Sequence, residues 1–226
     1  MEGAFVKVEV GGIEIELLGA RAARRGRTLF VADLHLGKSE ALRAAGAPMC
    51  GGDTGEQLRR LDQLVAITGV ERVVVLGDLL HAVSGVTEGL VESVASWRRS
   101  HVWTMSVVRG NHDRVLDDVA GAWRLCVLDP GTVDDGLELV HDPGDASRTQ
   151  AWVAGHVHPA VRIGGAANAI KLPCFHLVSG LGLVLPAFSM FTGGLCVRSG
   201  AGDRLFGATG RRVIEVGQTP ARASGW

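Results

Sequence analysis

Hydrophobic and polar residues alternate in two short segments near the start of the chain. Residues 6–10 and 13–17 flank a pair of glycines, a pattern that predicts two strands joined by a tight hairpin turn. An Arg- and Gly-rich connection is expected over residues 19–27. The continuous apolar run at residues 28–32 then predicts a strand that is buried on both faces.

Strand-like and helix-like patterns alternate in the next part of the chain. Apolar residues at helical spacing predict a helix that runs to about Thr68, with Asp53 or Thr54 as its N-terminal cap. The other elements expected here are helices over residues 39–45 and 86–99, a loop over residues 46–52, and buried strands over residues 73–76 and 102–108.

From about residue 124 the chain consists of short strand-like runs separated by Gly, Pro and Asp. These runs are residues 124–128, 137–140, 151–154, 174–178, 182–185, 195–197 and 212–216. Strand–helix alternation followed mostly by strands predicts an α/β fold in which two packed sheets have helices on the outside. Residues 1–216 are expected to form a single domain and residues 217–226 a flexible tail.

Composition places the chain among folded enzymes and binding domains. Of its 226 residues, 46% are hydrophobic and 21% are charged, a balance that supports a sizeable core and excludes a disordered protein. The net charge of −1 excludes a broad basic surface, so any contact with nucleic acid must be local. The sequence shows no leader pattern, no apolar run of membrane-spanning length and no C-x-x-C pair. We therefore expect a cytoplasmic protein without membrane association.

Five polar clusters follow apolar, strand-like runs. They are Asp33-x-His35, Gly77-Asp78, Gly110-Asn111-His112-Asp113, His141, and Gly155-His156-Val157-His158. Ligands of open α/β sheets bind just outside the carboxyl ends of the strands, so this placement predicts that the clusters meet in one crevice. Singly, each has a structural alternative, because Asp-x-His is frequent by chance and Gly-Asp often only forms a turn. Their shared placement and their order favour a functional site.

The donor atoms of these clusters favour metal binding. Two aspartates, one asparagine and four histidines offer carboxylate, amide and imidazole donors without a thiolate, a set that suits manganese, zinc or iron. Such a set is too large for one catalytic cation that keeps an open position. It suits two cations about 3.5–4 Å apart, which bind both ends of an in-line displacement at phosphorus. Manganese is the metal we expect.

The order of the motifs, D-x-H, GD, GNHD, H and GHxH, resembles that of the calcineurin-like metallophosphoesterases. The resemblance implies a four-layer α/β/β/α sandwich with a dinuclear metal centre. The ligands that it implies are Asp33, His35 and His158 for one metal, Asn111, His141 and His156 for the other, and Asp78 as the bridge between them. It also implies that His112 protonates the leaving oxygen or stabilises charge in the transition state, with Asp113 orienting it.

One position departs from the usual pattern of that family. The wider superfamily often has a carboxylate three residues after the aspartate of its GD motif, whereas this chain has His81. That carboxylate usually supports a ligand without binding metal itself, so the departure affects the tuning of the metals and not their presence. Two interpretations of His81 stay open, a functional substitute or an ordinary loop histidine.

Further motifs resemble those of a narrower group, the bacterial ligase-associated DNA-damage-response endonucleases. These motifs are Asp33-Leu34-His35-Leu36-Gly37-Lys38, Gly46-Ala47-Pro48, Leu76-Gly77-Asp78-Leu79-Leu80-His81, Gly155-His156-Val157-His158-Pro159, Leu172-Pro173-Cys174-Phe175, Leu185-Pro186-Ala187-Phe188 and Thr192-Gly193-Gly194. The resemblance implies a phosphodiesterase or endonuclease that cleaves nucleic acid or nucleotide diesters in DNA repair, in association with an ATP-dependent DNA ligase and a helicase. The alternatives are a phosphomonoesterase or pyrophosphatase for small nucleotides, and a non-catalytic scaffold. A scaffold would be expected to have lost ligands that this chain keeps.

Basic residues that would contact a substrate phosphate fall into two groups by position. Arg24, Arg25 and Arg27 precede a buried strand at the end opposite Asp33, so they are poorly placed for this crevice. The residues better placed to face it are Lys38, Arg43, Arg114, Arg162 and Lys171.

Overall fold

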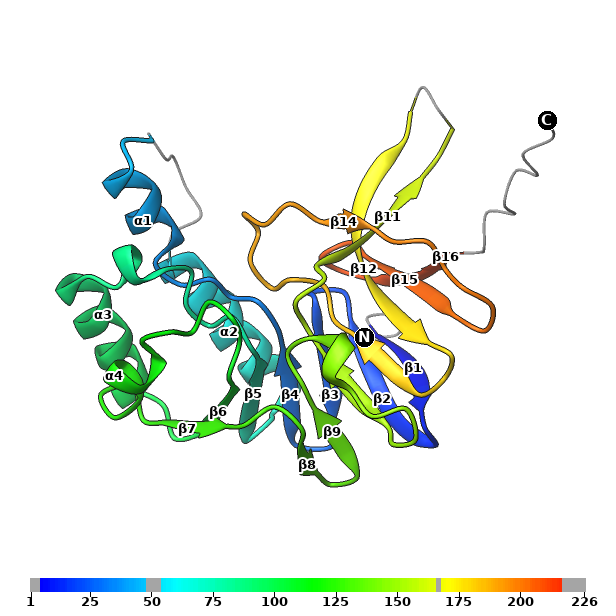
Figure 1. The fold of residues 1–226 in the computed structure, drawn as a ribbon, viewed down its shortest axis with the longest axis horizontal. Coiled ribbons are helices and arrows are strands. Elements are labelled where there is room, and N and C mark those ends of the chain that lie inside the picture. Colours follow the sequence, from blue (N-terminus) through cyan, green and yellow to red (C-terminus); the bar gives the residue numbers. More distant parts are fainter. Residues whose placement is uncertain (1–4, 48–53, 166–167, 217–226) are drawn as a thin grey trace.

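Seven strands form the first of two sheets in the computed structural model, which describes residues 5–47, 54–165 and 168–216 (Figure 1). In spatial order they are β1 (Phe5–Val10), β2 (Ile13–Leu18), β3 (Ala22–Arg25), β4 (Thr28–Val31), β5 (Arg72–Leu76), β6 (Thr104–Val108) and β7 (Leu125–Leu128). Neighbours from β1 to β4 are antiparallel, and neighbours from β4 to β7 are parallel. Asp53 and the tail predicted at residues 217–226 lie outside the described residues.

The hairpin predicted at the start of the chain is confirmed. Gly11 and Gly12 form its turn with φ of 55° and 81°, left-handed values that glycine adopts without steric cost. The connection predicted over residues 19–27 is wrong in part, because β3 occupies its centre. Ala22 and Ala23 are fully buried there, and the surrounding arginines and glycines conceal this two-residue apolar signal in the sequence.

Nine strands form the second sheet. They are β8 (Thr132–Asp134), β9 (Leu137–Leu139), β10 (Trp152–Ala154), β11 (Pro159–Ile163), β12 (Ile170–Val178), β13 (Gly182–Val184), β14 (Leu195–Cys196), β15 (Arg204–Ala208) and β16 (Val213–Val216). The path runs β14-β11-β12-β13-β10-β9-β8, with β15 pairing with β12 and β16 pairing with β15. The sequence pattern does not predict β8, β11 or β15, which are short or lie next to a polar motif.

Four α-helices follow strands of the first sheet: α1 (Lys38–Ala44), α2 (Thr54–Thr68), α3 (Glu88–Arg99) and α4 (Leu116–Ala120). Thr87 caps α3 by accepting a hydrogen bond from the backbone N–H of Leu90 at 3.2 Å, so the helix starts slightly later than predicted. The short helix α4 is not predicted by the pattern. In the described residues the remaining helical segments are two 3-10 turns, Val83–Gly85 and Pro143–Asp145.

Alternate residues of the first sheet face two different cores. Leu29 and Val73 belong to a core shared with α2, α3 and α4, whereas Phe30 and Val74 belong to a core shared with the second sheet. This is the two-residue period of a strand that is buried on both faces. The predicted α/β sandwich of two packed sheets is therefore confirmed, and both sheets are mixed. The α-helices of the described residues lie beside the first sheet (Figure 1).

The two sheets share their core through large side chains. Phe30 of the first sheet packs in the same cluster as Phe175 and Phe206 of the second, and all three are at most 2% exposed. Because one core joins both sheets, we propose that residues 1–216 form one domain. No helix in the described part of the chain is long and apolar enough to cross a membrane.

Candidate metal centre

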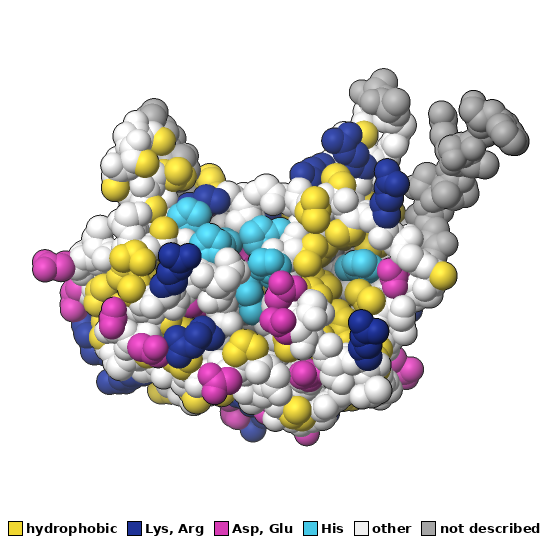
Figure 2. All heavy atoms as spheres, in the orientation of Figure 1, with side chains coloured by type: hydrophobic (Ala, Val, Ile, Leu, Met, Phe, Trp, Pro, Cys, Tyr) yellow, Lys and Arg dark blue, Asp and Glu magenta, His cyan; other side chains and the backbone are white. Residues whose placement is uncertain are grey.

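The turns that follow five strands meet at one edge of the sandwich. Three of these strands, β4, β5 and β6, are parallel neighbours in the first sheet, and β9 and β10 are parallel neighbours in the second. The site side chains that these turns carry are Asp33 and His35 after β4, Asp78 and His81 after β5, Asn111 and His112 after β6, His141 after β9, and His156 and His158 after β10. Figure 2 shows the histidines on the floor between two projecting parts of the surface.

Backbone hydrogen bonds join these turns to one another. The N–H of Asp33 donates to the carbonyl of Gly77 at 3.1 Å, and the N–H of His35 donates to that of Asp78 at 2.9 Å. In the second sheet the N–H of Gly155 donates to the carbonyl of His141 at 3.1 Å. The site is therefore carried by turns that fix one another, which holds its side chains in place before any ligand binds.

Left-handed backbone conformations concentrate in this site. Of nine non-glycine residues with positive φ in the described chain, five lie here: Asp33 (55°), His35 (51°), Asp78 (49°), His156 (68°) and His158 (48°). Each such residue costs about 1–3 kcal/mol, and strain of this kind persists where function requires it. The unusual backbone conformations thus occur at residues that the sequence motifs also identify as candidates for a functional site.

The glycines of the motifs are required by close packing around the site. A Cβ atom on Gly77 would overlap the imidazole of His141, and one on Gly110 would overlap the backbone nitrogen of Asp78. A Cβ on Gly155 would lie 3.0 Å from Oδ2 of Asp33. Glycine at these positions lets the turns approach closely enough for their donor atoms to meet.

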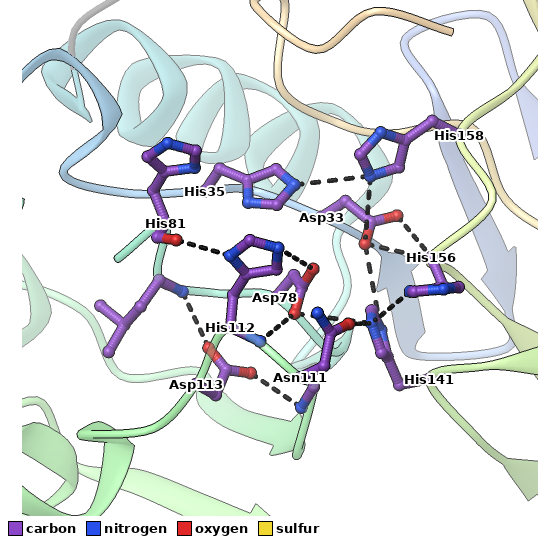
Figure 3. Close-up of polar contacts among 12 residues, drawn as sticks. Asp33, His35, Asp78, His81, Asn111, His112, Asp113, His141, His156 and His158 are labelled. Atoms are coloured by element: carbon purple, nitrogen blue, oxygen red, sulfur yellow. Dashed lines mark hydrogen bonds and ion pairs between the residues drawn. The ribbon is translucent and has the colours of Figure 1, made fainter. Parts of the chain in front are cut away.

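The first group of donors consists of Asp33, His35 and His158, whose potential ligand atoms all lie within 4.8 Å of one another (Figure 3). Nε2 of His158 is 3.4 Å from Nε2 of His35 and 3.5 Å from Oδ1 of Asp33. Burial, followed by the neighbouring charges of His158 and His81, lowers the pKa of His35 to about 2. His35 is therefore neutral at physiological pH, the form in which imidazole binds a metal.

The second group consists of Asp78, His141 and His156, together with Asn111. Nδ1 of His141 donates to the carbonyl of Leu76 at 3.0 Å, so the lone pair of the neutral ring is on Nε2. That Nε2 lies 2.9 Å from Oδ1 of Asn111, 3.1 Å from Nδ1 of His156 and 3.5 Å from Oδ1 of Asp78. The lone pair of His141 therefore faces the oxygens of Asn111 and Asp78, an arrangement that suits a cation bound by all three groups.

The two buried carboxylates also fit a pair of cations. Asp33 is fully buried and Asp78 is 3% exposed, and in the described chain their ion-pair partners are histidines, with no lysine or arginine among them. A buried carboxylate is costly unless a positive charge compensates it. The donor set and the burial together suit two divalent cations, and the assignment of individual ligands stays our prediction.

His112 lies beside these groups with its ring open to solvent. Its side chain is 43% exposed, its backbone N–H donates to Oδ1 of Asp78 at 2.9 Å, and its Nδ1 donates to the carbonyl of His81 at 2.7 Å. The imidazole of His81 stacks on that of His112 with ring centres 5.9 Å apart. His81 is thus part of the site geometry, which favours the functional interpretation over that of an ordinary loop histidine.

Asp113 contacts the backbone of the neighbouring turn. Its two carboxylate oxygens accept from the N–H groups of Leu80 and Gly110 at 2.9 and 3.0 Å. Burial raises the pKa of Asp113, although these two hydrogen bonds act in the opposite direction. In these contacts Asp113 fixes the turns that carry Asp78 and His112, so any orienting effect on the imidazole of His112 passes through the backbone.

One further site residue carries no clear signal in the sequence. Oδ2 of Asp142 is 3.6 Å from Nε2 of His156, so it can orient that ring while Nδ1 faces His141. Aspartate before Pro143 is ordinary turn chemistry, and only its position directly after His141 would have suggested a role.

The chain is similar to a known protein family and to solved structures. The model of the calcineurin-like phosphoesterase family matches residues 26–145. The crystal structure of the Pseudomonas putida nuclease MPE is 32% identical, covers 94% of this chain and 100% of that chain, and superimposes with a TM-score of 0.81. The phosphoesterase Yfce from E. coli is 17% identical over 84% of this chain and 97% of that chain, with a TM-score of 0.44. No curated protein matches the sequence.

Proposed function

Because the chain belongs to the calcineurin-like phosphoesterase family and is a metal-dependent phosphoesterase, we propose that it is a two-metal phosphodiesterase that cleaves nucleic acid. The observation that carries the proposal is that two groups of potential metal ligands lie at one edge of the sandwich, Asp33, His35 and His158 in one and the buried Asp78 with His141 and His156 in the other (Figure 3). The similarity to a protein described as a nuclease supports the substrate class.

We propose a division of the ligands that follows the family resemblance and is compatible with the two groups of donors. Asp33, His35 and His158 would hold one cation, Asn111, His141 and His156 the other, and Asp78 would bridge the two. Two divalent cations would polarise the phosphoryl oxygens and supply the nucleophile at neutral pH. Manganese is our proposed metal, because the donors are oxygen and imidazole nitrogen without a thiolate.

His112 is proposed as the group that protonates the leaving oxygen. Its Nδ1–H is engaged by the carbonyl of His81, so the proton that it can transfer is the one on Nε2. The side chain of His112 is 43% exposed, and its Nε2 faces the candidate metal centre, 3.9 Å from Oδ2 of Asp78. The tilt of the ring is fixed by the hydrogen bond and by the stack on His81, which keeps Nε2 in place during the transfer.

The motif resemblance supports a cellular context. We propose that the enzyme acts in the cytoplasm on DNA during repair, in association with an ATP-dependent DNA ligase and a helicase. Co-purification of the chain with such a ligase from cells is the measurement that checks the association, and its absence at native expression levels would count against it.

A substrate panel tests the proposed function. Protein loaded with manganese should cleave single-stranded DNA and bis(p-nitrophenyl) phosphate faster than p-nitrophenyl phosphate, because a nuclease acts on diesters. EDTA-treated protein should be inactive on all of them, and a cyclic nucleotide in the same panel separates a small-diester enzyme from a nuclease. A clear preference for the monoester, without cleavage of DNA, would establish the phosphomonoesterase alternative instead.

A further inference from the structure

Two hollows that share part of their lining lie beside the candidate metal centre. A hollow of about 290 Å³ has His158 in its wall and adjoins a second hollow of about 510 Å³. The two share Arg21, Lys171, Pro173 and Met190, and Arg60 lines the second. We call these five residues the basic groove. In the described chain no aspartate or glutamate lines either hollow, although the protein as a whole carries a net charge of −1.

Two arginines of the basic groove are held by backbone carbonyls. Nη1 of Arg21 donates to the carbonyls of Ala187 and Ser189 at 3.4 and 2.8 Å. Nη1 of Arg60 donates to the carbonyl of Phe188 at 2.8 Å, and its guanidinium lies 4.3 Å from the centre of the Phe188 ring. Carbonyls orient both side chains. The negative charge of Glu56 also acts on Arg60, so of the two guanidiniums that of Arg21 is the more available to an anion.

The pKa of Arg21 reflects its burial and, to a smaller extent, a neighbouring positive charge. Burial, and then the nearby guanidinium of Arg60, lower the pKa of Arg21 to about 10. The residue therefore stays charged at physiological pH beside a like charge. In the described chain no carboxylate forms an ion pair with it, in contrast to Arg24 and Arg25 in the adjacent strand β3, which pair with Glu16 and Asp135.

Lys171 supplies the third charge, from the other wall of the groove. It lies on β12 opposite Arg162 of β11, its side chain is exposed, and among the described residues it forms no hydrogen bond or ion pair. The β11–β12 hairpin is one of the two parts of the molecule that project beside the histidines, and Figure 2 shows basic side chains on that projection. An unpaired ammonium at this position is free to bind a ligand phosphate.

Apolar side chains accompany these charges. Met190 is 50% exposed within the basic groove, and Ile67, which lines its second hollow, is 68% exposed. A single nucleic-acid strand presents phosphates and base faces together, whereas a duplex encloses its bases. The combination of cations with exposed apolar surface therefore matches a single strand.

We propose that the basic groove binds the nucleic-acid strand beside the scissile position, with Lys171 and Arg21 contacting a neighbouring phosphate that is not cleaved. This inference rests on the proposed nuclease function. It also explains how a protein without overall positive charge can hold an anionic polymer, because the contact is confined to one groove that starts at His158.

Lys171→Ala and Lys171→Glu test the inference, since the exposed side chain forms no hydrogen bond or ion pair with the described residues whose loss would disturb the fold. The readout is the ratio of kcat/KM for a single-stranded oligonucleotide to kcat/KM for bis(p-nitrophenyl) phosphate, which has no second phosphate. This ratio should fall about tenfold in Lys171→Ala and further in Lys171→Glu. The dependence of log kcat/KM on log salt concentration should become shallower by about 0.7 for the oligonucleotide.

Lys7→Ala is the matched control, because it changes the net charge equally on β1, where the lysine pairs with Glu14. It should keep the wild-type ratio and salt dependence. If Lys171→Ala and Lys7→Ala behave alike while the wild-type protein cleaves the oligonucleotide, the inference is overturned and the proposed function stands. If the wild-type protein cleaves the small diester and no oligonucleotide, the proposed function and the inference both fail.

Discussion

Asp78→Asn is expected to lower turnover by about 10³-fold or more and to leave one manganese ion per chain where the wild-type protein binds two. The carboxylate of Asp78 is almost fully buried beside His141 and His156, and we propose that it bridges the two metals. Its negative charge offsets the repulsion between two close cations, and a neutral amide of the same shape does not. The hydrogen bond from the N–H of His112 to Oδ1 can be kept by the amide oxygen of asparagine, so the turn should retain its conformation.

Metal analysis and thermal unfolding separate this effect from misfolding. Metal-free Asp78→Asn should unfold at a temperature no lower than that of metal-free wild type, because a buried charge has been removed. Its rise in Tm on addition of manganese should be smaller than in wild type, since one binding site is lost. Asp117→Asn is the control, because that exposed carboxylate pairs with Arg109 and its loss should leave metal content unchanged. Normal activity in Asp78→Asn would contradict the bridging assignment.

His112→Ala is expected to keep both metals and the fold while losing about 10²–10⁴-fold in turnover on DNA, the usual contribution of a general acid. The loss should shrink markedly on bis(p-nitrophenyl) phosphate, because nitrophenolate is a stable leaving group that needs little protonation. His101→Ala is a suitable control, since His101 precedes β6 at the edge of the sheet opposite Asn111 and should affect neither substrate.

The pattern of losses in His112→Ala identifies the role of the imidazole. An equal loss on DNA and on the nitrophenyl diester would indicate stabilisation of transition-state charge by a cationic ring instead of proton transfer. Loss of a metal ion in the same variant would place His112 among the ligands and would require the assignment to be redrawn.

The convergence of the site could be predicted because it depends on strong sequence signals. Continuous apolar runs predict strands β4, β5 and β6. Because the carboxyl ends of parallel strands lie at the same edge of a sheet, Asp33, Asp78 and Asn111 are then expected to lie close together. The structure adds what spacing could not give: the hydrogen bond that fixes the tautomer of His141 and the stack of His81 on His112.

Other parts of the molecule could not be predicted, for identifiable physical reasons. Strand β11 starts directly after His158. Its short apolar run therefore cannot be distinguished, in the sequence, from the end of the polar motif that precedes it. Arg21 lies in a segment rich in arginine and glycine, and its place in the basic groove depends on carbonyls of residues 187–189, far along the chain. Contacts of this kind follow from tertiary structure and leave no local pattern.

The number of metal ions per chain tests the central claim most directly. Metal-free protein should be saturated with manganese, freed of unbound metal and analysed for metal and protein content. The His141→Ala variant, which lacks one proposed ligand of the second group, should be measured in parallel. We expect two manganese ions per wild-type chain and one in the variant, with the fold retained in both. At most one ion per wild-type chain at saturation would contradict the central claim.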